Sequence, residues 1–294
     1  MSGSRAVKWI DRVMDAIFLC CGIVAVAFVL VISAYLLVSG LPAIREIGLV
    51  DFLFGERWAP TASKDPAYGI LPFLLTSIYG TAGAIVIGVP IGLMTAIFLA
   101  KIAPPKVAKV TRTAVSLLAG IPSVVYGLVG MIILVPAIRD MFGLASGATL
   151  LAAILVLAVM ILPSIVNVSE TSLRAVPREY EEASLALGAT EIETIFKVTV
   201  PAAKSGIATA IVLGVGRAIG EAMAIIMVSG NVANMPGLLT SVRFLTTAIA
   251  SEMSYAAVGS LQRQALYSIA LVLFLFIMLI NVVLNVCVKN KKEK

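Results

Sequence analysis

The chain has 294 residues, of which 60% are hydrophobic and 13% are charged, and its formal net charge is +6. A soluble globular domain carries about 25% charged residues, so this composition excludes a soluble protein and indicates a polytopic membrane protein. The sequence contains no histidine, the commonest general base and metal ligand. It also lacks the G-x-x-x-x-G-K-[S/T] loop of ATP-binding proteins. We therefore expect no enzymatic chemistry, no metal and no cofactor in this chain.

Six apolar segments are long enough to cross a bilayer, which takes about 20 residues. They cover roughly residues 16–38, 73–100, 113–138, 148–166, 205–229 and 264–288. The first follows three basic residues, and its apolar run of 23 residues is longer than that of a typical signal peptide, so we interpret it as an uncleaved anchor. The sequence predicts an all-α membrane protein with six transmembrane helices.

The distribution of lysine and arginine predicts the orientation of these helices. With the N-terminus inside, the cytoplasmic segments carry more than twice as many basic residues as the outer segments. The positive-inside rule then places both termini in the cytoplasm. We expect three parts: an N-terminal helix and extracytoplasmic loop (1–72), a transmembrane core (73–288) and a basic cytoplasmic tail (289–294).

Two long outer segments, 39–72 and 230–263, have two open interpretations. They either lie on the membrane surface as connectors or form the landing surface for an extracytoplasmic protein. Within the spans, Gly88 and Gly92, and likewise Gly216 and Gly220, form G-x-x-x-G pairs that favour close helix packing.

A charged, amphipathic stretch separates the fourth and fifth spans and has the features of a helical hairpin, which we call the 177–204 hairpin. Pro177 suits the first turn of a helix, and the glutamates that follow complement its positive end. Gly188 is a plausible stop, because glycine tolerates the left-handed cap conformation. Thr190 and Glu193 then match a capping box that opens a second short helix.

The second helix of this hairpin is predicted to carry an apolar face. Ile192, Ile195 and Phe196 are expected on one side, and Pro201 is expected to close the helix. Two short helices at an angle would form a knob with an apolar surface for a partner.

The fifth span contains Arg217 and Glu221, the only charged pair within the predicted spans. An intramembrane charge is costly and usually faces a water-filled path or a partner. The i,i+4 spacing would place both heads on one helix face, where they can pair. Two interpretations stay open: a structural salt bridge, or a substrate path in which Arg217 offers a forked donor to an oxyanion and Glu221 orients it.

The 177–204 hairpin resembles the EAA loop of ABC importer permeases. Glu182-Ala183-Ser184, Gly188 and Pro201 fall at the spacing of E-A-A-x3-G-x9-I-x-L-P, with Ser as the third residue and Val for both Ile and Leu. In that family the loop is the coupling helix that docks on a separate ATP-hydrolysing subunit. The resemblance and the apolar face together assign ATPase coupling to Glu182, Ala183, Ser184, Gly188, Ile192, Ile195, Phe196 and Pro201.

Three further segments resemble the permease subunits of high-affinity phosphate importers. They are Y-G-I-L-P-F (68–73), G-I-P-S-V-V-Y-G (120–127) and G-V-G-R-A-I-G-E (214–221), and the Trp58-Ala59-Pro60 loop is similar to the PstC-type subunit. The resemblance implies a type I ABC importer permease fold in the cytoplasmic (inner) membrane. It implies as partners a PstA-like second permease subunit, an ATP-binding subunit dimer and an extracytoplasmic phosphate-binding protein, and no nucleic acid.

Two alternatives remain open at this point. The chain could be the permease of a related importer for another oxyanion, such as molybdate or sulfate, because the EAA loop does not specify the substrate. It could also be a stand-alone secondary transporter, which would need no ATPase-docking hairpin.

Overall fold

The structure, a computed structural model, describes residues 3–290. Residues 291–294, which belong to the predicted basic tail, lie outside the described residues. The α-helices are α1 (Gly3–Ile47), α2 (Leu49–Phe54), α3 (Leu71–Ile97), α4 (Pro105–Gly120), α5 (Ser123–Val129), α6 (Val135–Phe142), α7 (Leu150–Arg174), α8 (Arg178–Ala186), α9 (Glu191–Thr194), α10 (Val200–Ala202), α11 (Lys204–Gly220), α12 (Met223–Val228), α13 (Leu245–Glu252) and α14 (Leu261–Asn290). Three π-helical turns, η1 (Phe98–Ile102), η2 (Gly130–Leu134) and η3 (Ile195–Thr199), and two short antiparallel strands, β1 (Trp58–Ala59) and β2 (Ala67–Tyr68), complete the described fold.

Five helical segments among the described residues are long and apolar enough to cross a membrane, and a bent pair makes a sixth. The pair joins Glu191–Ala202 to Lys204–Gly220 with a bend of 70°. The predicted all-α membrane architecture is confirmed, with five spans, or six if the bent pair counts as one.

The third predicted span, 113–138, is wrong as a single helix. The helix α4 ends at Gly120, Ile121 is extended (φ −72°, ψ 127°), and the membrane-length segment is Ser123–Phe142. The physical reason is Pro122, which has no N–H and disfavours helical backbone in the residue before it. The predicted fourth span, 148–166, is too short, because α7 continues to Arg174 and includes Glu170.

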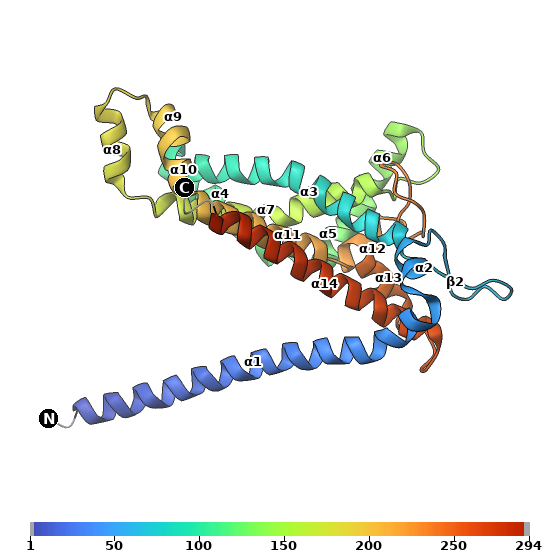
Figure 1. Cartoon of the computed structure of the whole chain (residues 1–294). Coiled ribbons are helices and arrows are strands. Elements are labelled where there is room, and N and C mark those ends of the chain that lie inside the picture. The colour runs from blue at the N-terminus through green and yellow to red at the C-terminus, as the bar shows by residue number, and fades with distance from the viewer. Residues whose placement is uncertain (1–2, 291–294) are drawn as a thin grey trace.

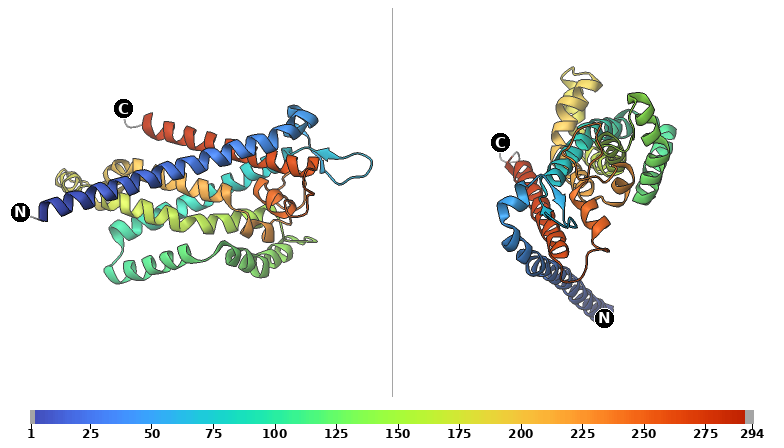
Figure 2. Two further views of the ribbon diagram at one scale, coloured as in Figure 1. Left: turned by 90° about the horizontal axis from the view of Figure 1, so that it is seen from below. Right: turned by 90° about the vertical axis from the view of Figure 1, so that its right-hand side faces the viewer.

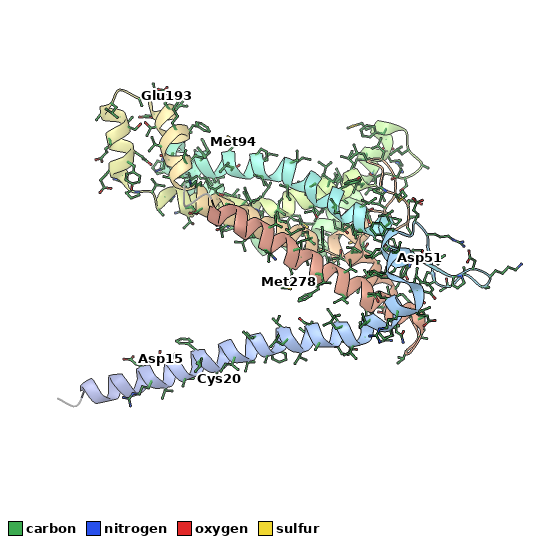
Figure 3. The ribbon with its side chains drawn as sticks, viewed as in Figure 1. Asp15, Cys20, Asp51, Met94, Glu193 and Met278 are labelled. Atoms are coloured by element: carbon green, nitrogen blue, oxygen red, sulfur yellow. The ribbon has the colours of Figure 1, made fainter. Side chains whose placement is uncertain are left out.

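The helices form an elongated bundle with two distinct ends (Figure 1). The helices α8 and α9 project from one end, and α2, α6, α13 and the β1–β2 hairpin lie at the other. Glu193, on the projecting hairpin, and Asp51, at the opposite end, mark these ends in Figure 3. The first turn of α1 and the last turn of α14 lie at the end of the bundle that carries α8 and α9 (Figure 2).

The helix α7 forms the centre of the core. Its residues Leu157, Met160, Ile161 and Ile165 are fully buried, and α3 and α11 pack against it. A Cβ on Gly88 would lie 2.7 Å from Ile161, and a Cβ on Gly92 would lie 2.8 Å from Ile165. This G-x-x-x-G pair therefore packs as predicted.

The two outer segments pack against each other. Glu252 on α13 accepts hydrogen bonds from Trp58 Nε1 at 3.0 Å and Gln262 Nε2 at 3.2 Å, and it forms an ion pair with Arg243. Trp58 is buried and also contacts Phe73 on α3. The segments thus form a cap over the end of the bundle opposite α8 and α9, and a role as a landing surface stays a prediction.

Candidate functional site

Arg217 lies in the last turn of α11 and is half-buried. It is 13 residues from Lys204, where α11 begins, which places it about 20 Å from the hairpin end at 1.5 Å per residue. Its side chain is partly exposed and, within residues 3–290, makes no hydrogen bond or ion pair. Tyr126 on α5 is close enough to interact with it electrostatically. A guanidinium at this depth without a partner in its own chain is available to an anion or to another subunit.

Glu221 does not pair with Arg217, and the predicted i,i+4 pair is wrong. The helix α11 ends at Gly220, and Glu221 is extended (φ −75°, ψ 129°). Its carboxylate accepts a hydrogen bond from the backbone N–H of Ala224 at 3.0 Å, and its carbonyl accepts one from Thr246 Oγ1 at 2.8 Å. The i,i+4 rule requires a continuous helix, and here the chain turns between the two charges.

The two phosphate-importer-like segments 120–127 and 214–221 are brought close together. The helix α5 packs on α12, which begins directly after the second segment. A Cβ on Gly127 would lie 2.8 Å from Cα of Ala224 and 2.9 Å from the sulfur of Met227, so only glycine permits this approach. The helix breaks at Ile121 and Glu221 therefore lie on either side of the contact between α5 and α12. Broken helices within a membrane usually line a cavity or binding site.

The surface beside Arg217 is not covered by the described residues. Gly216 and Gly220 have no atom within 4 Å of a built Cβ, and Leu213 on the same helix is about half exposed. The expectation of close packing at this second G-x-x-x-G pair is thus not met inside the described chain. We call Leu213, Gly216 and Gly220 the open face of α11.

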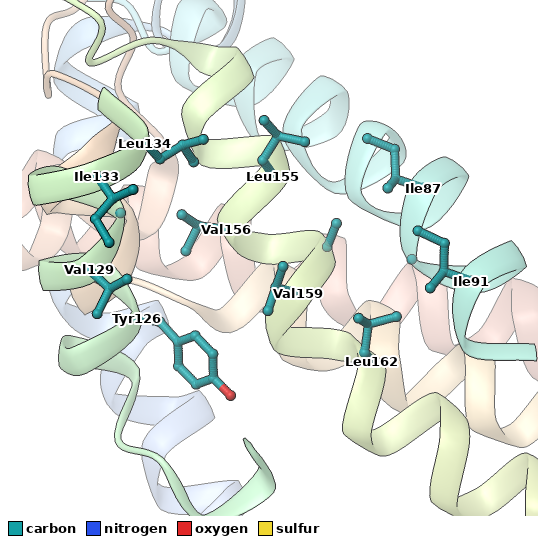
Figure 4. A pocket seen from close by; sticks show the side chains of 13 residues that line it. Ile87, Ile91, Tyr126, Val129, Ile133, Leu134, Leu155, Val156, Val159 and Leu162 are labelled. Atoms are coloured by element: carbon teal, nitrogen blue, oxygen red, sulfur yellow. The ribbon is translucent and has the colours of Figure 1, made fainter. Parts of the chain in front are cut away.

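A separate apolar groove of about 440 Å³ lies between α3, α5 and α7 (Figure 4). Its lining includes Ile87, Ile133, Leu155 and Leu162. The hydroxyl of Tyr126 lies at its edge and donates to the carbonyl of Leu118 at 2.7 Å. A wall of this kind offers no donor to an oxyanion, so the groove is not a candidate anion path.

The 177–204 hairpin has the predicted local structure. Gly188 adopts φ +86° after α8, as a glycine stop requires. The capping box is present: Thr190 Oγ1 accepts from the Glu193 backbone N–H at 3.3 Å, and the Glu193 carboxylate accepts from the Thr190 N–H at 3.1 Å. Hydrogen bonds from Lys197 and then from Thr190 lower the pKa of Glu193 to about 2, so the box is charged at neutral pH.

The apolar face of the hairpin differs from the prediction. Ile195 is buried against the bundle, whereas Ile192 and Phe196 are 66% and 48% exposed. The helix passes into the π-turn η3 at Ile195, and residues three apart no longer lie together. The helical segment ends at Ala202, one residue after Pro201 and before the 70° bend, close to the predicted end.

The remaining coupling candidates lie on α8, which has no buried residue. Glu182 and Ala183 are exposed, and Leu187, just after α8, is 90% exposed. Ser184 instead points inward, where its hydroxyl lies 2.9 Å from that of Thr194. The hairpin thus presents a carboxylate and several apolar side chains at the projecting end of the molecule.

Sequence reasoning missed two ion-pair groups beside the hairpin. Glu181 on α8 pairs with Lys101 in η1. Glu170 on α7, whose side chain is 8% exposed, accepts from Arg112 at 2.6 Å and from Arg174 at 2.9 Å. The i,i+4 spacing of Glu170 and Arg174 could have predicted their ion pair. The other partners lie far apart in the sequence.

Clusters of metal-ligating side chains do not occur in the described part of the chain. Residues 3–290 contain no group of three or more Cys, Asp and Glu side chains that could hold a metal ion.

Comparison with known proteins identifies relatives over most of the chain. Residues 88–290 match the family described as binding-protein-dependent transport system inner membrane component. A probable ABC transporter permease protein, YqgH, of Bacillus subtilis is 40% identical, covering 95% of this chain and 92% of its own. The phosphate transport system permease protein PstC of Pasteurella multocida is 36% identical, covering 76% and 75%, and that of Xylella fastidiosa is 34% identical, covering 85% and 83%.

Solved structures share the fold. A bacterial alginate ABC transporter, in complex with an alginate-bound periplasmic protein, gives a TM-score of 0.61 at 14% identity, covering 95% of each chain. The inward-facing MetNI methionine ABC transporter gives a TM-score of 0.56 at 22% identity, covering 76% of this chain and 94% of its own. At these identities the likeness concerns the fold alone.

Proposed function

The chain belongs to the family of binding-protein-dependent transport system inner membrane components, and on this basis we propose that it is the channel-forming permease subunit of an ATP-driven phosphate importer. Its relatives include phosphate transport system permeases named PstC from several bacteria. The single observation that carries the proposal within the structure is Arg217, a half-buried guanidinium with no ion-pair partner among the described residues.

Arg217 is the residue we assign to the anion. A guanidinium presents a planar fork of donors that matches the oxygens of phosphate. No carboxylate of the described chain neutralises it, so its positive charge extends to the open face of α11. The helix breaks at Ile121 and Glu221 keep the surrounding backbone irregular, as in other transporter binding regions.

We assign Glu221 a structural role, because its carboxylate binds the backbone of α12. Its carboxylate caps α12 through the Ala224 N–H and therefore holds the turn that follows Arg217. The residue shapes the path and leaves the guanidinium free for the substrate.

ATP hydrolysis belongs to a separate subunit, because the family is a transport component and the chain lacks an ATP-binding loop. We assign docking of that subunit to the exposed residues of the 177–204 hairpin: Glu182, Ala183, Leu187, Ile192 and Phe196. Gly188 and Ser184 keep the hairpin in shape. ATP binding would then close the ATPase dimer, move the two hairpins and open the path alternately to each side.

The remaining partners follow from the same assignment. A PstA-like second permease subunit would cover the open face of α11, and an extracytoplasmic phosphate-binding protein would dock on the cap at the opposite end. The hairpin and both chain ends would then face the cytoplasm.

The test is uptake of labelled phosphate by the reconstituted complex. The chain is placed in liposomes with its second permease subunit and ATP-binding subunit, with ATP inside and binding protein outside. We expect ATP-dependent phosphate accumulation that excess sulfate or molybdate does not reduce. Uptake blocked by either competitor would favour a permease for that oxyanion.

A further inference from the structure

The hairpin end of the bundle contains two neighbouring polar groups that are joined through the backbone of η1 and together involve four elements. They consist of Lys101 and the Leu99 carbonyl in η1, Glu181 on α8, Arg112 on α4, and Glu170 and Arg174 on α7. We name these groups the polar junction.

Glu181 links α8 to the transmembrane helices through an ion pair. No residue of α8 is buried, so apolar packing holds it weakly. Glu181 pairs with Lys101 and also accepts a hydrogen bond from Thr199 at 3.0 Å. The side chains of Glu181 and Lys101 are only 23% and 16% exposed, so water screens this pair less than a surface pair.

The next step runs through the backbone of η1. Lys101 is two residues from Leu99, whose side chain is buried. The Leu99 carbonyl lies in the last turn of a helix, where carbonyls have no helical donor. It accepts hydrogen bonds from Arg174 at 2.7 Å and Arg112 at 3.3 Å, so the same short turn that carries Lys101 also contacts both arginines.

Arg112 carries the connection into α4. Within this chain α4 buries only Ala108 and Val115, and Arg112 holds it to α7 through Glu170. At its far end α4 stops at the break before Pro122, and α5 continues to the contact with α12 near Arg217. The helix α4 is therefore weakly packed within this chain. A helix break follows one end, and an ion pair holds it to α7 nearer the other.

We propose that the polar junction transmits movement of the 177–204 hairpin to α4, with Glu181 and Arg112 as its positioning residues. Glu181 faces inward to the bundle, while Glu182, its neighbour, faces outward to the ATPase. The inference rests on the proposed function, because it assumes that the hairpin receives work from an ATP-binding subunit.

The test measures movement of α4 directly. Two spin labels are attached in a background without the three native cysteines, at Lys109→Cys on α4 and Val50→Cys on α2, both exposed. The distance between the labels is compared with and without ATP and vanadate in the full complex. In the parent complex, we expect ATP and vanadate to change the distance between the labels. In Glu181→Gln the distance should stay the same. When Glu181→Lys is combined with Lys101→Glu, the change in distance should return.

The matched control is Lys197→Gln. Lys197 pairs with Glu193 at 2.9 Å, but this pair stays within the hairpin. The control should show the same change in label distance as the parent and should retain phosphate uptake. Glu181→Gln should transport about fivefold less phosphate per ATP hydrolysed, or less still, which is within the range measured for mutations that weaken coupling between two sites.

Each other outcome counts against the proposal. It is overturned if α4 does not move in the parent, if Glu181→Gln shifts like the parent, or if the charge exchange fails to restore the shift. Loss of the ATP-binding subunit from Glu181→Gln would also contradict it, because docking is assigned to the outward residues. A parent complex that moves α4 but accumulates no phosphate would contradict the proposed function and leave the junction supported.

Discussion

The carboxylate of Glu221 lies 3.0 Å from the backbone nitrogen of Ala224 and caps the start of α12. The same carboxylate is the one that spacing alone would pair with Arg217. Because it is committed to the backbone, the guanidinium four residues earlier has no neutralising partner in the described chain. This separation makes Arg217 the centre of the account.

Replacing Glu221 should therefore disturb the turn between α11 and α12 more than it changes the environment of the Arg217 guanidinium. Glu221→Gln keeps an acceptor oxygen for the Ala224 N–H and should retain most of the uptake. Glu221→Ala removes the cap, which costs about 1 kcal/mol, and should lower the midpoint of thermal unfolding of the purified complex. If Gln were as damaging as Ala, the negative charge and not the cap would be the function of this residue.

Replacing Arg217 should strongly reduce phosphate uptake without disturbing assembly. Arg217→Gln removes a charged hydrogen-bond donor, and interactions of that kind contribute about 1.5–3 kcal/mol, or about tenfold to a hundredfold in phosphate uptake. Arg217→Lys should recover part of the uptake, because it restores the charge but not the fork. The control is Arg139→Gln, an exposed arginine paired with Asp140, which should leave uptake unchanged.

The contact between α5 and α12 should not tolerate a methyl group at Gly127. A Cβ there would meet the backbone of Ala224 at 2.8 Å, and overpacking of this kind typically costs about 1–3 kcal/mol. We expect Gly127→Ala to lower the thermal stability of the purified chain. Gly120→Ala is the matched change in the same segment, and with nothing within 4 Å it should be neutral. Equal stability of the two variants would show that this contact does not matter.

The exposed apolar residues of the hairpin should hold the ATP-binding subunit. Leu187→Ser or Phe196→Ser should reduce the amount of ATP-binding subunit that copurifies with the chain, since each removes apolar surface from the contact. Tyr255→Ser changes a side chain that is 89% exposed and follows α13, which lies at the opposite end of the bundle. That control should copurify normally, and a loss there as well would indicate a general folding defect.

The outer cap should depend on Glu252. Its carboxylate accepts from Trp58 and Gln262 and pairs with Arg243, and both ionic side chains are less than 20% exposed. Glu252→Ala should destabilise the chain by roughly 1.5–3 kcal/mol, because donors of a charged pair lose their acceptor. Asp65→Ala breaks a pair with Arg57 that is largely exposed and should cost about 0–1 kcal/mol. Thermal unfolding of both variants measures the difference.

Local features were predictable because neighbouring residues specify them. The capping box of Thr190 and Glu193 and the glycine stop at Gly188 depend on a few adjacent residues, and both are present. The Arg217–Glu221 pair failed because the rule assumes a continuous helix, and a competing cap ends the helix first.

Other features depended on tertiary structure. Ile195 faces inward because a π-turn changes the helical spacing, which no apolar pattern revealed. The ion pairs of Glu181 with Lys101 and of Glu170 with Arg112 join residues 80 and 58 positions apart. Only the packing of α3, α4, α7 and α8 brings them together.

The central claim is that a separate ATP-hydrolysing subunit, docked on the 177–204 hairpin, drives phosphate through this chain. The most direct measurement is uptake of labelled phosphate into liposomes that contain the two permease subunits, with and without the ATP-binding subunit. The account predicts accumulation only when that subunit and ATP are both present. Accumulation of phosphate without the ATP-binding subunit would contradict it.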